Sequence, residues 1–332
     1  MSALIDLPPY GPRDEARFQA ELATLAEHHR RGCPAYARIR GAGEGTALHV
    51  GVFKHLELRT EHEGRETGRT LHSSSTSGVA SRIHLDPRSG DLQARSGLAI
   101  LKDFVGAEPG PLLILDSVRS LRSRELSARV AAAMSLKPLA TELFFLLDDP
   151  AKPDSFQREE LARALERPGP VRVYGFTSLL WQAWPKDLRL DRPVVFVHSG
   201  GWKKLEEQKV DRATFDRALL ATAAPGSKVI DYYGLVEQVG VIYPLCEQGF
   251  RHVPVWAGVR VLDPYTGEPV ADGQGGVLEL ANLLAWGAPY HHVVTEDLGR
   301  IEPGPCPCGR SGPRFELLGR IPKAEVRGCA NQ

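Results

Sequence analysis

The chain has 332 residues, 42% of them hydrophobic and 25% charged, and its 41 basic and 41 acidic residues cancel. This size and composition are typical of a globular protein with one large or two ordinary domains. The balanced charge excludes a general attraction to nucleic acid or to an anionic membrane. No window approaches twenty uninterrupted apolar residues, and residues 1–6 lack the order of a signal peptide. We therefore expect a cytoplasmic protein without a membrane span.

Strand and helix patterns alternate through the first 250 residues. Helices are predicted at 12–31, 120–135, 156–166 and 211–223, and strands at 82–86, 112–116, 171–176, 194–198 and 228–233. Residues 143–147 fit a buried strand, although they could also end a helix that starts near residue 138. The alternation predicts an α/β sheet covered by helices, in which ligands gather at the carboxyl ends of the strands. From about residue 251 the pattern becomes β, and 258–263 and 276–280 flank a turn-rich stretch that predicts a hairpin-like subdomain.

A hydroxyl-rich stretch stands out at residues 72–81 (HSSSTSGVAS), with six Ser or Thr residues and one glycine. Consecutive Ser and Thr disfavour a helix interior, because their hydroxyls compete for backbone groups. In a loop they offer a polyphosphate several donors, and the glycine lets the backbone approach closely. A solvated linker has the same composition. The strand pattern that follows at once favours the phosphate-binding interpretation.

Two predicted strands end in unusual turns. Residues 197–204 (VHSGGWKK) place paired glycines after a strand, where a flat ring or a phosphate can approach the backbone. A simple tight turn is the alternative. Residues 232–238 (YYGLVEQ) place Glu237 after the next strand, where a carboxylate can hold Mg²⁺ that bridges substrate phosphates. The alternative for Glu237 is a surface glutamate after a turn.

The five cysteines, at positions 33, 246, 306, 308 and 329, form an odd set in a chain too large to need disulfides. Cys306 and Cys308 flank a proline in a rigid turn, and Cys246 lies six residues before His252. Three sulfur donors and one nitrogen donor would complete a tetrahedral Zn²⁺ site. The sequence therefore predicts a structural zinc that ties the β subdomain to the core.

These motifs resemble, in order, those of the adenylate-forming superfamily. Residues 73–78 (SSSTSG) are similar to its phosphate loop [ST]-[ST]-G-[ST]-[ST]-G, with Ser75 in place of glycine and Ser81 where many members have lysine. Residues 233–237 resemble Y-G-x-[TV]-E, residues 295–300 (TEDLGR) resemble T-G-D-x-x-R, and Gly319-Arg320 resembles the hinge G-R. Four ordered matches spread from residue 73 to residue 320 argue against coincidence.

The resemblance implies an ATP site. The phosphate loop would bind the β- and γ-phosphates, the glycine pair would lie on the adenine, Tyr233 would stack on it, Asp297 would accept from the ribose hydroxyls and Arg320 would reach ribose or phosphate. The predicted nucleotide-binding residues are Ser73, Ser74, Ser75, Thr76, Ser77, Gly78, Gly200, Gly201, Tyr232, Tyr233, Gly234, Asp297 and Arg320. Glu237 would hold magnesium. C-P-C-G-R at 306–310 resembles phenylacetate-CoA ligases, in which such a set supports a structural zinc.

The resemblance also suggests an organisation and a branch. An adenylating α/β core is expected at 1–250, a β subdomain that completes the nucleotide site at 251–318, and a hinge and tail at 319–332. The nearest branch looks like the acyl-protein synthetases of bacterial luminescence, which pass an acyl group from acyl-AMP to a cysteine near their own C-terminus and then to a reductase. Cys329 matches that cysteine in position. An incidental tail cysteine is the alternative.

Most of the superfamily completes its site with a C-terminal domain whose lysine binds the carboxylate and the α-phosphate, and we expect that domain to be missing here or reduced to a tail. A carboxylate that attacks ATP needs a cation beside Mg²⁺. The candidates are Lys203, Lys204 and Lys323, of which we prefer Lys203. The predicted catalytic residues are then Glu237, Lys203, His198 and Cys329.

The leading hypothesis is ATP-dependent activation of a carboxylic acid as acyl-AMP and transfer of the acyl group to a thiol. Coenzyme A or a carrier protein is an alternative acceptor, with Cys329 idle. A non-catalytic nucleotide-binding subunit is a third hypothesis, motivated by the absent domain and by Ser75 and Ser81. Aromatic and apolar side chains near residues 173–184, His198 and Tyr232 suggest an apolar or aryl acyl group.

Overall fold

The computed structural model of the protein describes residues 3–41, 45–61, 68–73, 80–122, 128–238 and 240–321. Its α-helices are α1 (Glu15–Gly32), α2 (Pro34–Arg40), α3 (Val52–His55), α4 (Pro87–Val105), α5 (Ala128–Ser135), α6 (Arg158–Leu165), α7 (Thr177–Ala183) and α8 (Arg212–Leu220). Its strands are β1 (Leu48–His49), β2 (Arg69–His72), β3 (Arg82–Leu85), β4 (Gly110–Ile114), β5 (Ala140–Phe145), β6 (Val171–Phe176), β7 (Val194–Ser199), β8 (Lys228–Tyr233), β9 (Tyr243–Pro244), β10 (Arg251–His252), β11 (Ala257–Leu262), β12 (Gly275–Asn282), β13 (His292–Ile301) and β14 (Arg314–Arg320). Short 3₁₀ turns, among them η2 (Val118–Arg122), η4 (Lys203–Gln208) and η5 (Val236–Gln238), connect several of these elements.

One sheet, which we call the parallel sheet, has the strand order β5-β4-β6-β7-β8-β9. Its first five strands run parallel, and β9 runs antiparallel to β8. The central strands β4, β6 and β7 are mostly apolar and buried, because helices cover the sheet on both faces. The predicted α/β sheet covered by helices is therefore confirmed, and β6 and β8 have the predicted bounds.

The second sheet, which we call the C-terminal sheet, has the order β10-β14-β13-β12-β11, and β1 pairs with β13. The predicted hairpin is present, with Val261 opposite Leu278 in the antiparallel pair of β11 and β12. The strand β1 pairs in parallel with β13 through Leu48 and Val293. A segment from the first fifty residues thus becomes part of a sheet built mainly from the last eighty.

The predicted boundary at residue 250 coincides only in part with the division between the sheets. The chain does pass from the parallel sheet to the C-terminal sheet between β9 and β10. The helix α1 nevertheless packs on the C-terminal sheet, where Phe18 lies against Gly258 and His29 Nε2 lies 2.8 Å from the Ala285 carbonyl oxygen. The division into domains at residue 250 stays a prediction, and the burial of α1 depends on a partner surface far along the chain.

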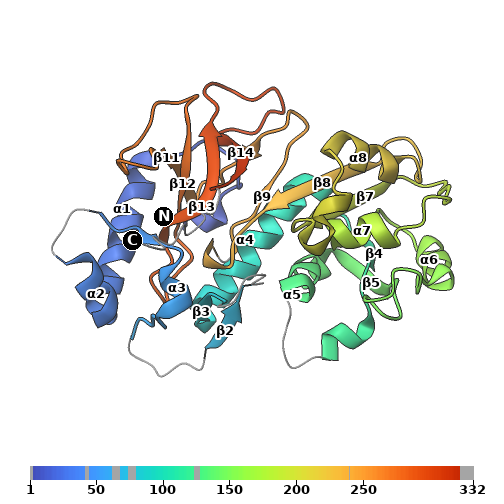
Figure 1. Ribbon diagram of the computed structural model, residues 1–332, viewed down its shortest axis with the longest axis horizontal. Coiled ribbons are helices and arrows are strands. Elements are labelled where there is room, and N and C mark those ends of the chain that lie inside the picture. The colour runs from blue at the N-terminus through green and yellow to red at the C-terminus, as the bar shows by residue number, and fades with distance from the viewer. Residues whose placement is uncertain are drawn as a thin grey trace, which may run out of the picture.

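The long helix α4 was not predicted. Its sequence carries a start signal, since Asp86 caps the helix by accepting a 3.1 Å hydrogen bond from Ser89 N and Pro87 occupies the first helical position. Ser96 Oγ on this helix accepts from Trp256 Nε1 at 2.7 Å and donates to the Gly240 carbonyl at 2.6 Å. In Figure 1 the helix crosses the middle of the molecule between the two sheets.

Two local predictions need correction or completion. The predicted helix at 120–135 is α-helical only from residue 128, because η2 occupies 118–122 and residues 123–127 lie outside the described part. The ambiguity at 143–147 is resolved in favour of a strand, β5, which pairs in parallel with β4. Pairing with a buried neighbour decides between strand and helix where the local pattern does not.

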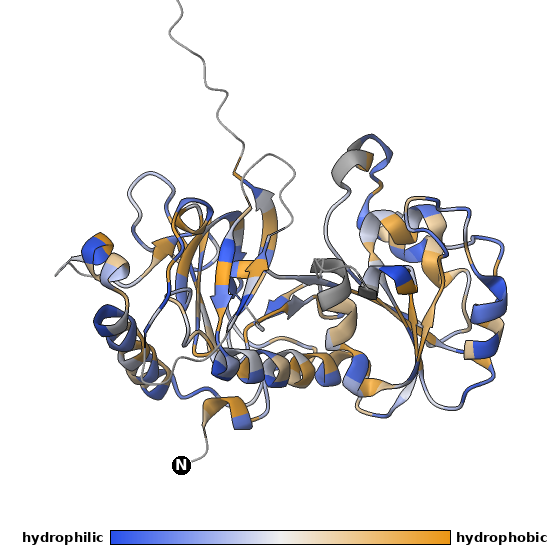
Figure 2. Ribbon diagram, turned by 90° about the horizontal axis from the view of Figure 1, so that it is seen from below, coloured by the Kyte–Doolittle hydropathy of each residue, from blue (hydrophilic) through white to orange (hydrophobic). Residues whose placement is uncertain are grey.

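The buried apolar side chains form two clusters. One lies around Phe196 and Trp184 in the parallel sheet, and the other joins Phe315 and Trp256 in the C-terminal sheet to residues of α1, α4 and β4. Figure 2 shows hydrophobic residues in the strands and hydrophilic residues on the outward sides of the helices. Among the described helices, none combines the length and the apolar character that a membrane crossing needs.

Candidate active site

The turn after β7 leaves its backbone open on one side. Gly200 has a φ of 77°, which favours glycine, and its carbonyl accepts a 2.7 Å hydrogen bond from Thr177 Oγ1. A Cβ placed on Gly201 would meet no atom within 4 Å. Because β7 and β8 are parallel neighbours, with Ser199 opposite Tyr232, this turn lies beside the turn after β8. The predicted glycine pair and tyrosine-led turn therefore share one edge of the sheet.

Three predicted nucleotide-binding residues meet at the Asp297 carboxylate. Tyr233, at the end of β8, donates to Asp297 Oδ2 at 2.8 Å, and Arg320 Nε, at the end of β14, donates to Asp297 Oδ1 at 3.1 Å. Asp297 lies opposite Arg320 in the pairing of β13 with β14 and is buried. Burial and the Asp297 charge raise the pKa of Tyr233, so its hydroxyl stays a donor. This contact joins the two sheets.

Tyr232 and Tyr233 point to opposite faces, as neighbours on a strand must. The Tyr232 hydroxyl lies among the Ser199 and Tyr174 hydroxyls, and burial raises its pKa. In the described part of the chain, only the second tyrosine of the pair bonds Asp297. Gly234 follows it in an exposed position. The geometry thus separates the two tyrosines, which the sequence pattern had grouped.

The base of the hydroxyl-rich loop lies next to Glu237. Ser73 N donates to the Ser81 carbonyl at 3.1 Å, and Ser81 N donates to Ser73 Oγ at 2.8 Å, so the loop closes at this pair. Glu237, in η5, is buried, and burial raises the pKa of its carboxyl group, while the neighbouring Ser81 hydroxyl and the Lys54 charge oppose that rise. The predicted loop residues Ser74, Ser75, Thr76, Ser77 and Gly78 lie outside the described residues.

An ion pair that sequence reasoning did not assign lies beside these groups. Lys54 Nζ on α3 is 3.3 Å from Glu296 Oε1 on β13. The sequence held only an indirect signal, because Glu296 occupies a place where the resembled pattern has glycine. The backbone of the preferred Lys203 begins η4, but its side chain is not described, and neither is that of Lys204. Lys323 and Cys329 lie outside the described residues.

His198, near the end of β7, is buried beside the glycine turn. Its Nδ1 lies 2.9 Å from Thr177 Oγ1, and within the described structure its Nε2 has no hydrogen-bond partner. Burial lowers the pKa of His198 to about 4, so the imidazole is neutral at pH 7. Its ring centroid is 4.8 Å from that of Phe215. A neutral, half-partnered imidazole in an apolar setting suits positioning or proton exchange more than charge stabilisation.

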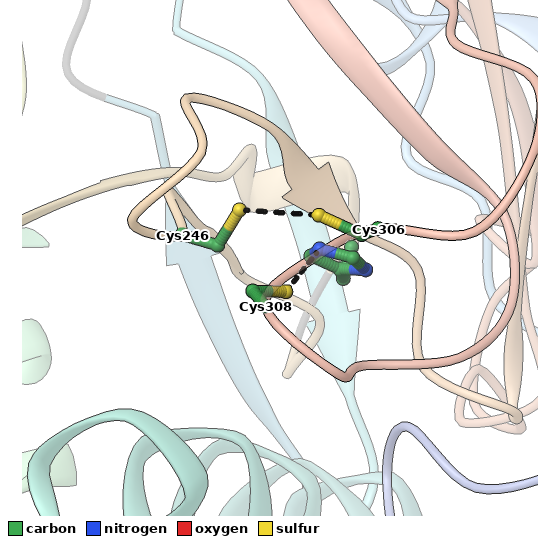
Figure 3. A group of neighbouring side chains, drawn as sticks. Cys246, Cys306 and Cys308 are labelled. Carbon is green, nitrogen blue, oxygen red and sulfur yellow. Dashed lines mark hydrogen bonds between the residues drawn. The ribbon is translucent and has the colours of Figure 1, made fainter.

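The four predicted zinc ligands converge. Ligand atoms of Cys246, His252, Cys306 and Cys308 all lie within 4.8 Å of one another. Cys246 Sγ is 3.9 Å from Cys306 Sγ, and Cys308 Sγ is 3.2 Å from His252 Nε2 (Figure 3). Cys246 comes from the turn between β9 and β10, His252 from β10, and Cys306 and Cys308 from the turn before β14. Three sulfurs and one imidazole nitrogen at this spacing fit a tetrahedral Zn²⁺ ion.

Comparison with known proteins gives one family match and several partial relatives. Residues 45–332 match the family described as "Acyl-protein synthetase, LuxE". A long-chain-fatty-acid–luciferin-component ligase of Aliivibrio fischeri is 33% identical over 143 residues, which are 41% of this chain and 36% of that protein. The phenylacetate-coenzyme A ligase of Thermus thermophilus is 28% identical over 141 residues, which are 41% of this chain and 29% of that protein. The matches therefore span about a third of these relatives' length.

Solved structures give the fold. The open conformation of 2-hydroxyisobutyryl-CoA ligase, in complex with 2-HIB-AMP and CoA, has a TM-score of 0.62 and 18% sequence identity, and the match covers 95% of this chain and 77% of that one. The same ligase in the thioesterification state has a TM-score of 0.61 and 17% identity, with 95% and 70% of the two chains covered. At this identity the likeness shows a common fold.

Proposed function

Because the chain belongs to the acyl-protein synthetase family, LuxE, we propose that it activates a carboxylic acid with ATP and transfers the acyl group to a thiol. The observation that carries the proposal is the convergence of Tyr233, Arg320 and Asp297 beside Glu237 and the base of the hydroxyl-rich loop. These groups come from both sheets and from the separate hairpin of β2 and β3. A site of this kind suits a ligand as long as a nucleoside triphosphate.

Each group has a role in the proposed site. Asp297 accepts hydrogen bonds from the ribose hydroxyls, and Arg320, which donates to Asp297 Oδ1, reaches toward the ribose or a phosphate. The open backbone at Gly200 and Gly201 receives the adenine. The hydroxyl-rich loop binds the outer phosphates. The Glu237 carboxylate would hold Mg²⁺, which would neutralise phosphate charge.

The proposed chemistry has two steps. A carboxylate oxygen of the acid attacks the α-phosphorus, the bond from that phosphorus to the bridging oxygen breaks, and pyrophosphate leaves with the electron pair. A thiolate then attacks the acyl carbonyl, AMP leaves, and a thioester remains. The thiol proton passes to solvent or to a neighbouring base.

Pyrophosphate exchange into ATP tests the first step. A panel of straight-chain fatty acids and aryl acids, incubated with the protein, magnesium and labelled pyrophosphate, separates the proposal from a non-catalytic nucleotide-binding subunit. We expect exchange above the acid-free background for one class of acid. Nucleotide binding without exchange for any acid would contradict the enzyme assignment. The proposed use of ATP favours a cytoplasmic site of action.

The acyl group has two candidate acceptors: the thiol of Cys329, and the thiol of coenzyme A or a carrier protein. We propose Cys329 as the internal carrier, because the family match extends through residue 332. Intact-mass measurement after incubation with ATP and acid should show an acyl adduct on the wild type and none on Cys329→Ser. An adduct that persists in this variant would refute the carrier role. Thioester formed only when coenzyme A or a carrier protein is added would favour the alternative acceptor.

We further propose that the cluster of Cys246, His252, Cys306 and Cys308 holds a structural zinc ion. Elemental analysis should find about one zinc per chain in the wild type. Cys308→Ser should lose zinc and lower the melting temperature, whereas Cys33→Ser, a buried cysteine outside the cluster, should keep its zinc. Full zinc retention in Cys308→Ser would contradict the assignment.

A further inference from the structure

Lys54 lies where the groups of the proposed ATP site meet. The strand β1 pairs with β13, and Val50 N donates to the Val294 carbonyl at 2.9 Å, so α3 starts beside the strand that carries Asp297. The same short helix packs against β3, which leads out of the hydroxyl-rich loop. Lys54 is therefore placed between the loop and the strand of the proposed ribose-binding acid.

The charges around Lys54 are mostly acidic. Its ammonium group is 3.3 Å from Glu296 Oε1, and its charge opposes the rise that burial causes in the pKa of Glu237. Burial raises the pKa of Glu296, but the hydrogen bond and charge of Lys54, together with the charges of Arg320 and His49, outweigh this, and the net shift is downward. The nearby Arg320 already donates to Asp297 at 3.1 Å. Arg320 is therefore paired with the proposed ribose ligand Asp297, whereas Lys54 is paired with Glu296, which has no proposed role in binding ribose.

The pair of Lys54 and Glu296 is open to water. Their side chains are 34% and 37% exposed. Ion pairs at this exposure contribute about 0–1 kcal/mol, so a polyphosphate with several negative charges can compete for the lysine. A flexible four-carbon stem lets the ammonium move by a few ångströms without a change of backbone. The geometry permits Lys54 to exchange one anionic partner for another.

We propose that Lys54 binds the α-phosphate of ATP during adenylation and that Glu296 holds the lysine in place when no nucleotide is bound. This inference rests on the proposed function. In ATP the α-phosphate lies between the ribose and the outer phosphates, and Lys54 lies between β13, which carries Asp297, and β3, which follows the hydroxyl-rich stretch. When the carboxylate attacks the α-phosphorus and pyrophosphate departs, charge on the α-phosphate oxygens increases in the transition state. A fixed cation at that point lowers the barrier.

Glu296 gives the proposal a feature specific to this chain. The resembled pattern T-G-D has glycine at this place, so a carboxylate there has no part in the general scheme. Here it holds the ammonium next to β13 in the free protein. Removal of Glu296 should therefore free Lys54 without removing the phosphate-binding cation.

The experiment compares Lys54→Met, Lys54→Arg and Glu296→Gln with the exposed control Lys152→Met. Each is assayed for acid-dependent pyrophosphate exchange and for thioester formation from chemically prepared acyl-AMP. We expect Lys54→Met to reduce the kcat of exchange about 100-fold, in line with loss of one transition-state cation. Lys54→Arg should recover part of it. Lys152→Met should stay within about threefold of wild type, Glu296→Gln should lose less than Lys54→Met because the cation is kept, and transfer from acyl-AMP should be nearly unchanged in all variants.

The possible failures are distinguishable. Wild-type protein without exchange for any acid would overturn the proposed function, and this inference with it. Wild-type exchange with Lys54→Met within about threefold would overturn the inference alone. Equal losses in Lys54→Met and Glu296→Gln, in both half-reactions and with lower melting temperatures, would show a structural ion pair instead of a phosphate ligand.

Discussion

The two sheets contribute to the candidate site in different ways. The parallel sheet supplies residues from turns that follow its strands, such as Gly200 and Gly201 after β7 and Glu237 after β8. The C-terminal sheet supplies residues from within or at the end of strands, with Asp297 on β13 and Arg320 on β14. In the parallel sheet, the place of a residue in the sequence predicts its place in the fold. The reason is that the carboxyl ends of parallel strands share one edge.

In the C-terminal sheet, the place of each site residue depends on the register between paired strands. Asp297 lies opposite Arg320 only because β13 and β14 pair as they do, with an irregularity between Leu298 and Gly299. A shift by one residue would turn the Asp297 carboxylate to the other face of the sheet. Local motifs therefore predict the half of the site that lies in the turns of the parallel sheet. The half on β13 and β14 depends on how those strands pair.

The largest expected effect comes from truncation of the two cores. Phe196 in the parallel sheet and Phe315 in the C-terminal sheet are fully buried. Each Phe→Ala change should lower the free energy of unfolding by about 3–5 kcal/mol. Calorimetry should show a single transition that both variants lower, because α4 and the Tyr233–Asp297 contact join the sheets. Two separate transitions, each sensitive to one variant, would show that the sheets unfold independently.

The next effect tests the turn-based half of the site. Glu237→Gln keeps the shape of the side chain but removes the proposed magnesium ligand, so exchange activity should fall by about 100-fold. Glu268→Gln, on an exposed turn, is the matched control and should be unaffected. The raised pKa of Glu237 predicts that activity falls at a higher pH than for an ordinary glutamate, because the carboxylate must be ionised to bind metal. Activity of Glu237→Gln close to wild type would contradict the metal-binding role.

A double-mutant cycle tests the strand-based half. Tyr233→Phe and Asp297→Asn each weaken the 2.8 Å contact between the sheets. We expect a coupling energy of about 0.5–3 kcal/mol between the two positions, measured from ATP affinity or from unfolding. Tyr174→Phe with Asp297→Asn should show additive effects, since Tyr174 contacts Ser199 instead. Additivity in the first pair would show that the contact does not couple the sheets.

The smallest effect is a pH dependence of the free energy of unfolding. One buried histidine reports on each sheet: His29 on the C-terminal sheet and His198 on the parallel sheet. Burial lowers the pKa of His29 to about 3 and that of His198 to about 4. The unfolded chain takes up these protons below about pH 6.5, so stability is full above that pH and is lost as the pH falls toward the folded values. Each histidine should contribute a slope of up to about 1.4 kcal/mol per pH unit.

Urea unfolding at several pH values between 4 and 7 measures this slope. His29→Gln should reduce the slope, because it removes the titrating ring that packs on the C-terminal sheet, with Nε2 2.8 Å from the Ala285 carbonyl oxygen. His198→Gln should also reduce the slope, because it removes the titrating ring on β7 of the parallel sheet. If both variants keep the wild-type slope, the acid sensitivity comes from other groups.

The sequence by itself determined the α/β class, several strands and the motifs of the site, because hydrophobic runs, turn residues and cysteine pairs are local properties. It named the four residues of the Cys–His cluster and the three residues, Tyr233, Asp297 and Arg320, that meet at one carboxylate. It did not predict α4, although Asp86 and Pro87 form a helix start, because Asp86 also fits the strand pattern at 82–86.

Only the tertiary structure decided which distant segments meet. The packing of α1 and β1 on the C-terminal sheet, the separate surroundings of Tyr232 and Tyr233, and the pairing of Lys54 with Glu296 depend on contacts across up to about 250 residues of chain. No local pattern encodes them, because strand register and helix docking are chosen by burial of the whole apolar surface at once.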